Sequence, residues 1–154
     1  MKSEQSMVVF SIDARRYAVA LHFVQRVVRV TAVTSVPKAP SFLLGIFNLR
    51  GTVLPVINMR ERLDHVQRPI QLSDQLLIIA GTKQTMAFLV DNTYGVIECV
   101  PADPGPLLSD LFSGMVKWEG GLILTLHPDH LLSRTEEVDI FPVLKNGDSY
   151  RSIR

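Results

Sequence analysis

The sequence predicts a mainly β protein built from packed antiparallel barrels. Glycine and proline interrupt the chain at short intervals, and the segments between them are short, β-branched and often alternate between apolar and polar residues. Roughly nine or ten strand-like segments occur with only two or three helical turns. Strands and helices do not alternate regularly, so a parallel α/β sheet is disfavoured.

The start of the chain predicts a hairpin followed by a helical turn. Apolar side chains alternate in Val8–Ile12 and again in Tyr17–Leu21, with a turn at Asp13–Arg16 between them. From His22 onward the apolar residues follow helical spacing, so we expect one or two helical turns there. Val33–Val36 predicts a further strand, after which a proline-rich segment connects to the next element.

Two predicted strands flank the dipeptide Arg50-Gly51. Pro55 in the second strand cannot donate to a ladder, which predicts an edge, a bulge or a barrel seam at that position. The predicted elements of this part are the strands Gly45–Leu49 and Thr52–Asn58, the short helix Met59–Leu63, and the polar, mobile connector Asp64–Asp74.

The second half predicts the same kinds of element. Glu119-Gly120-Gly121 predicts a tight hairpin, because glycine accepts positive φ. The final residues, Thr135–Arg154, are rich in charge, and we expect part of this tail to be disordered. The other elements, in order, are the strand Leu76–Ala80, a turn at Gly81–Gln84, the strand Met86–Val90, a turn at Asp91–Gly95, the strand Val96–Val100, a loop at Pro101–Pro106, the strands Met115–Trp118 and Leu122–Leu126, and the short helix Pro128–Leu132.

Composition excludes several classes of function. Sixteen Lys and Arg residues against fifteen Asp and Glu residues leave a net charge of +1, with no basic stripe, so nucleic acid is not an expected partner. The longest stretch without charge, Ala39–Leu49, is too short to span a bilayer, and no secretory signal is expected at the N-terminus. The single cysteine, Cys99, cannot form an internal disulfide, which is compatible with a reducing cytosol.

The chain carries no recognisable catalytic or cofactor motif, so we expect neither enzymatic activity nor a cofactor. Glycine-rich dinucleotide and phosphate loops and the serine-hydrolase elbow are all missing from the sequence. His127 and His130 have a spacing that can hold a metal ion, but a third ligand is not evident, and exposed polar residues at a helix cap are the favoured interpretation. Cys99 is interpreted as a core residue and Asp91 as a turn residue rather than a general base.

Asn48-Leu49-Arg50-Gly51 is the segment with the strongest indication of binding. The arginine follows an apolar strand, so its five donors stand on a rigid platform where they can bind carboxylates or carbonyls. Two interpretations have equal weight: the guanidinium covers carbonyls of its own fold, or it contacts a partner. Four apolar neighbours, Phe47, Leu49, Val53 and Leu54, would give a largely apolar site with one polar anchor, which is typical of protein interfaces.

From about Val8 to Leu132 the chain resembles the CheW family of bacterial chemosensory coupling proteins. The block Gly45–Arg60 is the most specific, because the family places Gly-x-x-Asn-Leu-Arg-Gly before an apolar-Pro-apolar strand. The other segments that carry the resemblance are Val9–Ile12, Tyr17–Val19, Val24–Val27, Pro37–Phe42 and, more loosely, Phe88–Asp91 and Leu122–Leu132.

The resemblance implies two packed five-stranded antiparallel β-barrel subdomains that share a core, spanning residues 8–134, followed by the charged tail 135–154. It also implies a non-enzymatic adaptor that couples chemoreceptor cytoplasmic tips to the regulatory domain of a CheA-type histidine kinase. Such a protein is cytoplasmic, and it lies at the inner membrane only through receptor arrays. The alternative is a binding module of the same fold with a different protein or small-ligand partner.

The resemblance places the receptor tip in a groove between the barrels. Carried over residue by residue, the expected groove residues are Asn48, Leu49, Arg50, Gly51, Val24 and Arg26. Arg26 is a departure, since the family commonly has glutamate there, close to the motif arginine. Two cations about 4 Å apart would repel each other by roughly 4 kcal/mol. We therefore expect Arg26 to turn away from Arg50 or to share an acidic partner with it, and we expect a partner surface of altered charge, as in an accessory pathway.

Overall fold

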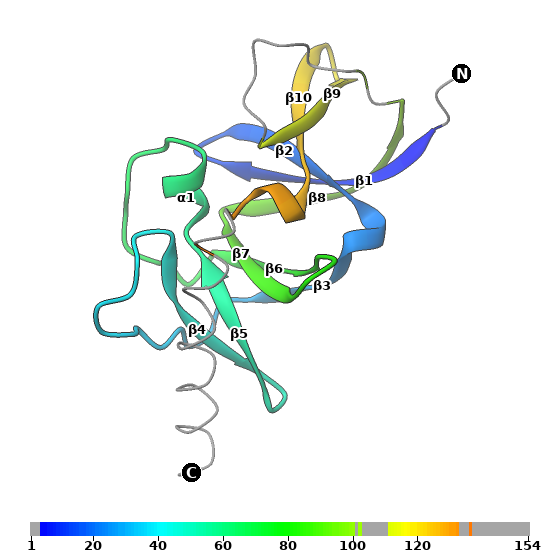
Figure 1. Cartoon of the computed structure of the whole chain (residues 1–154). Coiled ribbons are helices and arrows are strands. Elements are labelled where there is room, and N and C mark those ends of the chain that lie inside the picture. Colours follow the sequence, from blue (N-terminus) through cyan, green and yellow to red (C-terminus); the bar gives the residue numbers. More distant parts are fainter. Residues whose placement is uncertain (1–3, 101, 103–110, 133–135, 137–154) are drawn as a thin grey trace.

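The structure, a computed structural model, describes residues 4–100, 102, 111–132 and 136, and it is mainly β (Figure 1). None of the helices in these residues has the length and apolar character needed to cross a membrane. Most of the predicted loop 101–106 and of the predicted tail 135–154 lies outside the described residues. The elements are β1 (Gln5–Ile12), β2 (Arg15–Ala20), the 3-10 turn η1 (Leu21–Phe23), β3 (Val24–Arg29), β4 (Leu43–Leu49), β5 (Thr52–Ile57), α1 (Met59–Arg62), β6 (Gln75–Ala80), β7 (Thr85–Val90), β8 (Asn92–Cys99), β9 (Phe112–Trp118), β10 (Gly121–Leu126) and the 3-10 turn η2 (Pro128–His130).

The ten strands form two five-stranded sheets, which confirms the main prediction for the fold. Sheet A has the order β8-β1-β2-β10-β9, and sheet B has the order β3-β6-β7-β5-β4. The prediction of purely antiparallel barrels is wrong in one respect, because β10 pairs with β2, and β5 with β7, in parallel. Local turn signals predict only hairpins, whereas these two parallel pairs join strands that are distant in the sequence.

Among the described residues, neither sheet closes into a barrel by a continuous ladder. In sheet B a single pair, Thr34 and Ile46, bridges the segment after β3 to β4 through two backbone hydrogen bonds of 2.9 Å. Sheet A has the matching bridge, between Ala102 and Met115 on β9. The predicted strand at Val33–Val36 is therefore reduced to this one bridge.

The two halves of the chain repeat one another at a spacing of 69 residues and exchange strands. The pair Val28–Leu76 in sheet B corresponds to the pair Ile97–Met7 in sheet A, each residue lying 69 positions from its counterpart. The hairpins β4–β5 and β9–β10 share the same register and the same bulge. Sheet A therefore combines β1 and β2 from the first half with β8–β10 from the second, and sheet B has the reverse composition.

Three apolar clusters lie in layers through the molecule. The largest lies between the sheets and includes Phe10 and Val19 of sheet A together with Leu77 and Phe88 of sheet B. A second cluster lies on the far side of sheet B and a third on the far side of sheet A. The central strands β1, β2, β6 and β7 are buried on both faces, which explains their nearly continuous apolar sequences.

The helix predicted from His22 is wrong beyond its first turn, since Val24–Arg29 is strand β3. The register shifts between Val24 and Arg26, where one extra residue is left out of the pairing with β6. This bulge brings Val24 and Val27 to the same face, opposite Ile79 and Leu77 respectively. The bulge thus produces a three-residue apolar spacing that is also typical of a helix.

Two other local predictions need correction. The predicted turn at Asp91–Gly95 is instead the start of β8, and Gly95, with a φ of 92°, follows the bulge in that strand. Of the three positions predicted for Pro55, the structure excludes the edge, because β5 is flanked by β4 and β7. The parallel pairing with β7 begins only at Val56, one residue beyond the proline.

The bridge that joins the edges of sheet B requires glycine at position 45. A Cβ atom on Gly45 would lie 2.3 Å from the carbonyl oxygen of Thr34, so Gly45→Ala must displace backbone. We expect this variant to lose at least about 2 kcal/mol of unfolding free energy, measured by urea denaturation. Gly121→Ala is the control, since its Cβ would come no closer than 3.8 Å to Trp118, and we expect a change within about 0.5 kcal/mol. Equal stability of the two variants would contradict the steric argument.

Candidate functional site

Four of the predicted groove residues lie at the end of β4 and in the tight turn that joins it to β5. Leu49 pairs with Thr52, so Arg50 and Gly51 are the two central residues of the turn. Their φ angles, 50° and 91°, are both positive, as a type I′ hairpin turn requires. The Asn48 side chain stabilises the turn, because its Oδ1 accepts the Gly51 N–H at 2.8 Å.

The Arg50 side chain is directed to the outside of the fold. It is exposed and forms no hydrogen bond or ion pair with the described residues. The interpretation that Arg50 covers carbonyls of its own fold therefore gains no support. A non-glycine residue with positive φ costs about 1 kcal/mol, and such strain often accompanies function. The five N–H donors of the Arg50 guanidinium are therefore available to a binding partner on a rigid hairpin.

The apolar surroundings of Arg50 are smaller than the sequence predicts. Phe47 and Leu54 are buried in the core of sheet B, with exposed fractions of 6% and 3%. Only Leu49 and Val53 remain half-exposed beside the turn. The accessible apolar surface at this turn is therefore restricted to two side chains.

Val24 and Arg26 lie on β3, which is the other edge strand of sheet B. Val24 is half-buried against the core between the sheets, whereas Arg26 is exposed and forms no ion pair with the described residues. Arg26 shares no acidic side chain with Arg50 among these residues. The structure thus groups Asn48–Gly51 in one turn and leaves Val24 and Arg26 on a separate strand.

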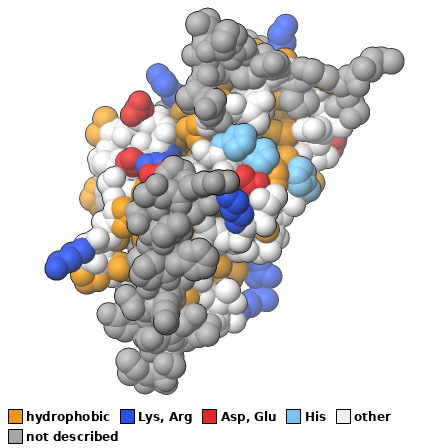
Figure 2. Space-filling model, in the orientation of Figure 1, with side chains coloured by type: hydrophobic (Ala, Val, Ile, Leu, Met, Phe, Trp, Pro, Cys, Tyr) orange, Lys and Arg blue, Asp and Glu red, His pale blue; other side chains and the backbone are white. Residues whose placement is uncertain are grey.

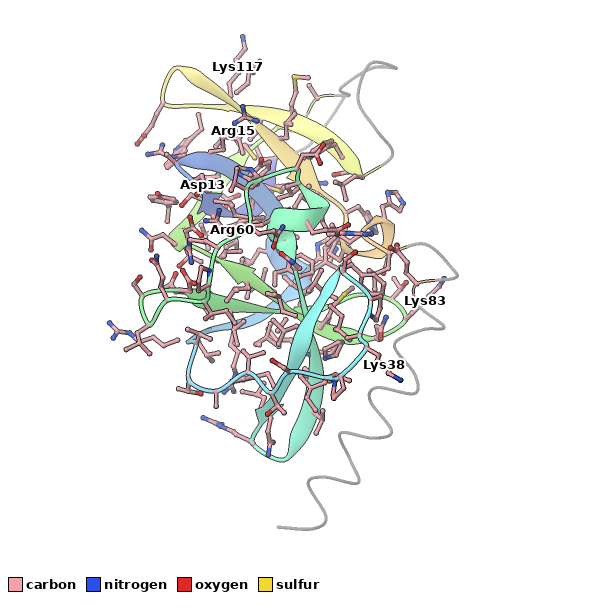
Figure 3. The ribbon with its side chains drawn as sticks, turned by 90° about the vertical axis from the view of Figure 1, so that its left-hand side faces the viewer. Asp13, Arg15, Lys38, Arg60, Lys83 and Lys117 are labelled. Atoms are coloured by element: carbon pink, nitrogen blue, oxygen red, sulfur yellow. The ribbon has the colours of Figure 1, made fainter. Side chains whose placement is uncertain are left out.

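A partly buried ionic cluster at the seam between the sheets was missed by the sequence analysis. Arg60 of α1 donates two hydrogen bonds of 2.8 Å to Asp13 in the β1–β2 turn and two of 3.0 Å to Asp91 after β7. Figure 3 shows Asp13 and Arg60 next to each other. Arg68 forms ion pairs with both Asp91, at 2.7 Å, and Asp74, at 2.8 Å. We call these five residues the seam cluster.

The seam cluster fixes the connector 64–74, which the sequence predicts to be mobile. Arg60 also donates to the carbonyl of Val66 at 2.9 Å, and Asp74 accepts the Gln71 N–H at 2.8 Å. His65 lies between Tyr17, at 2.7 Å, and Asp13, at 3.2 Å. The connector is thus attached to sheet A as well as to the elements on either side of it.

Charge pairing shifts the pKa values within this cluster. Hydrogen bonds from Arg60 hold the pKa of Asp13 below its ordinary value. Burial opposes the ionisation of Asp74, but the Arg68 guanidinium and the Gln71 N–H outweigh it, so the pKa of Asp74 is also lowered. Burial lowers the pKa of Arg60, yet its bonds to Asp13 and Asp91 outweigh this effect and raise it. Asp13, Asp74 and Arg60 are therefore ionised at neutral pH.

The seam cluster has a structural role rather than a catalytic one. Asp91, which the sequence analysis considered as a general base, accepts hydrogen bonds from two guanidinium groups, so both of its carboxylate oxygens are engaged within the fold. One sequence signal could have identified the cluster. A charged residue follows shortly after each of two buried apolar strands, Arg60 after β5 and Asp91 after β7. Because Arg60 and Asp91 are far apart in the sequence, no local pattern predicts that they form an ion pair.

The candidate metal ligands His127 and His130 lie side by side at η2. Their rings stack with centroids 4.5 Å apart. Among the described residues, no group of three or more His, Cys, Asp or Glu side chains is arranged to hold a metal ion. Cys99 is half-buried, and burial raises the pKa of its thiol, which disfavours the reactive thiolate.

Comparisons with known proteins agree with this fold. The model of the CheW-like domain family matches residues 6–136. The chemotaxis protein CheW of Thermotoga maritima is 31% identical over 146 residues, covering 89% of this chain and 91% of that protein. The CheW of Bacillus subtilis is 31% identical over 97 residues, covering 63% of this chain and 62% of that protein. The crystal structure of the scaffolding protein TtCheW from Thermoanaerobacter tengcongensis is similar with a TM-score of 0.75 and 26% identity, covering 88% of this chain and 96% of that one.

The lowered pKa of Asp74 predicts a specific loss of stability in acid. Because the folded-state pKa lies below the ordinary value of 3.8, the stabilisation is present above about pH 4 and is lost as the pH falls through the folded-state value. We expect Asp74→Asn to be less stable than the parent at pH 7 by about 2 kcal/mol, with the difference shrinking below about pH 4. Urea denaturation at a series of pH values measures this.

The matched control for this experiment is Asp64→Asn. Asp64 lies on the same connector but is exposed, so the variant should follow the parent at every pH. A stability difference for Asp74→Asn that stays constant from pH 7 to pH 2 would show that the carboxylate charge is not what stabilises the seam.

Proposed function

Because the chain belongs to the CheW-like domain family, we propose that it is a chemosensory adaptor without enzymatic activity. In this proposal it couples the cytoplasmic tips of chemoreceptors to the regulatory domain of a CheA-type histidine kinase. The observation that carries the proposal is the family match across residues 6–136, supported by relatives named chemotaxis protein CheW and by a similar structure titled as a scaffolding protein. The protein would act in the cytoplasm and reach the inner membrane only through receptor arrays.

We assign the receptor tip to the surface that carries the β4–β5 turn and β3. The proposed contacts are Asn48, Leu49, Arg50, Gly51, Val24 and Arg26. A helical partner needs a few apolar anchors and a polar rim. Leu49 and Val24 are half-exposed and can serve as anchors, while Arg50 and Arg26 supply exposed cations with no internal ion pair among the described residues.

An adaptor of this kind transmits a signal by the geometry of its complex. A ligand shifts an equilibrium only through different contacts with the two states, so the adaptor must bind one kinase state better than the other. The interlocked sheets support such a role, because a displacement of one sheet must strain the seam cluster that ties it to the other. The β4–β5 and β9–β10 turns lie at opposite ends of the molecule, which leaves room for two partners at once (Figure 1).

Arg50→Ala tests the proposed receptor surface. We expect it to weaken binding of a receptor cytoplasmic fragment by about 2 kcal/mol or more, since a fully desolvated arginine at an interface is often a hot spot. Isothermal titration calorimetry measures the affinity, and circular dichroism verifies the fold. Lys117→Ala, which removes an exposed cation on β9, is the control and should bind as the parent does. Unchanged affinity of a folded Arg50→Ala protein would remove Arg50 from the site.

Arg26→Glu tests the inference that the partner surface has altered charge. Arg26 is exposed on an edge strand, so reversing its charge should leave the fold intact. We expect weaker binding to the receptor encoded with this protein and stronger binding to a receptor whose usual coupling protein has glutamate at this position. Isothermal titration calorimetry with both receptor fragments measures the two affinities. If neither affinity changes, the partner is not complementary to Arg26.

The alternative is a binding module of the same fold with a different protein or small-ligand partner. Binding assays with CheA-type regulatory domains distinguish the two proposals. Failure to bind any such domain, together with a small molecule that copurifies with the protein, would favour the alternative.

A further inference from the structure

Three large apolar side chains of the connector 64–74 lie in solvent. Val66 and Leu72 are 82% and 84% exposed, the highest values for large apolar residues in the described part of the chain, and Ile70 is 39% exposed. We call these three residues the connector patch. Figure 1 shows the connector as a green loop that leaves α1 and follows the left margin of the molecule, and Figure 2 shows hydrophobic side chains along the same margin. Single exposed apolar residues are ordinary, whereas three within seven positions form a surface that favours association.

Several polar side chains of the same connector bind inward. His65 contacts the first hairpin, and Arg68 pairs with Asp74, as described above. Gln67 Oε1 accepts the side-chain N–H of Asn58 at 2.8 Å. The connector thus holds its polar groups against the fold and presents its apolar groups to solvent in a fixed arrangement. A preordered surface of this kind loses little conformational entropy when it binds.

The surface of the connector is nearly free of charge. Residues 66–73 contain one charged side chain, Arg68, which is 23% exposed and pairs with two carboxylates. Neither an acidic nor a basic partner finds an unpaired charge of opposite sign in this stretch. Two copies of the stretch can approach each other without repulsion between like charges, and the net charge of +1 adds little repulsion between whole molecules.

The order of residue types around Pro69 is nearly the same in both directions. A glutamine lies two positions away on each side, Gln67 and Gln71, and a large apolar residue lies three positions away, Val66 and Leu72. In a contact with twofold symmetry, each residue meets its counterpart on the other copy and is met by it in the same way. Two antiparallel copies of this segment therefore place apolar residues opposite each other at both ends.

We propose that the connector patch is a contact between two copies of this chain, which pack antiparallel across a twofold axis near Pro69. In this contact Val66 of each copy lies against Leu72 of the other, and the two Ile70 side chains cover the centre. The absence of unpaired charge and the symmetric order of residues favour a second copy over a partner of different chemistry. The inference goes beyond the proposed function and does not rest on it.

The size of the connector patch indicates a weak dimer. An extended segment of seven residues is about 20 Å long, and three side chains cover much less than the roughly 800 Å² per partner of a standard interface. The contact is therefore concentration-dependent rather than permanent. It becomes stronger where other interactions already hold copies of the chain close together.

Small-angle X-ray scattering of the full chain over a concentration series tests this proposal. We expect the apparent mass to rise toward that of a dimer, with a dissociation constant below about 1 mM. Leu72→Glu places a carboxylate against Val66 twice in each dimer and should raise the dissociation constant about tenfold or more. The control is Leu122→Glu on β10, where the parent side chain is 64% exposed, and it should dimerise as the parent does. A parent chain that stays monomeric at about 1 mM, or equal effects of the two variants, would overturn the proposal.

A mixing experiment tests the antiparallel arrangement. Val66→Lys and Leu72→Glu should each weaken self-association, and both side chains are exposed, so the fold is retained. In a mixture of the two variants, the substituted position 66 of one copy lies opposite the substituted position 72 of the other, and their charges attract. The remaining Leu72 and Val66 keep their apolar contact. We expect the mixture to dimerise about tenfold more tightly than either variant alone. A mixture that associates no better than the separate variants would refute the proposed contact.

Discussion

The burial of the Arg60 guanidinium at the seam is the interaction on which the rest of the structure depends. A charge with only 10% of its side chain exposed must be fully paired, because an uncompensated buried cation costs several kcal/mol. Its partners Asp13 and Asp91 come from distant parts of the chain, and Val66 comes from the connector that follows α1. The pairing therefore forms only when both sheets and the connector are in place, which links the fold of each part to that of the others.

The exchange of strands between the two halves of the chain also makes the folding of each sheet depend on the other. Each sheet is incomplete without strands from the other half, and the largest apolar cluster lies between the sheets. Four of the eight strand ladders join strands that are distant in the sequence, so neither sheet can be expected to fold alone. For an adaptor this is useful: two ends of one interlocked body can hold two partners at a fixed distance, and a change at one end strains the other.

The two halves of the chain share a backbone arrangement but differ in charge. The turns Arg50-Gly51 and Glu119-Gly120 occupy equivalent positions, and both begin with a non-glycine residue at positive φ, yet their charges are opposite. Arg60 and Asp129, which lie 69 positions apart, differ in the same way. The repeated backbone therefore presents charges of opposite sign at equivalent positions of the two halves.

The sequence alone determined the β-rich class, the short strands, the hairpin at Arg50-Gly51 and the family resemblance, because these depend on local alternation, turn chemistry and a contiguous motif. It predicted one or two helical turns from His22 onward, where Val24–Arg29 is strand β3, since the bulge in β3 gives the same apolar spacing as a helical turn. Only the tertiary structure decided the parallel pairings, the burial of Phe47 and Leu54, and the meeting of Asp13, Arg60 and Asp91. These features join residues that are far apart in the chain, and no local pattern of side chains records which distant partner a strand or a charge will find.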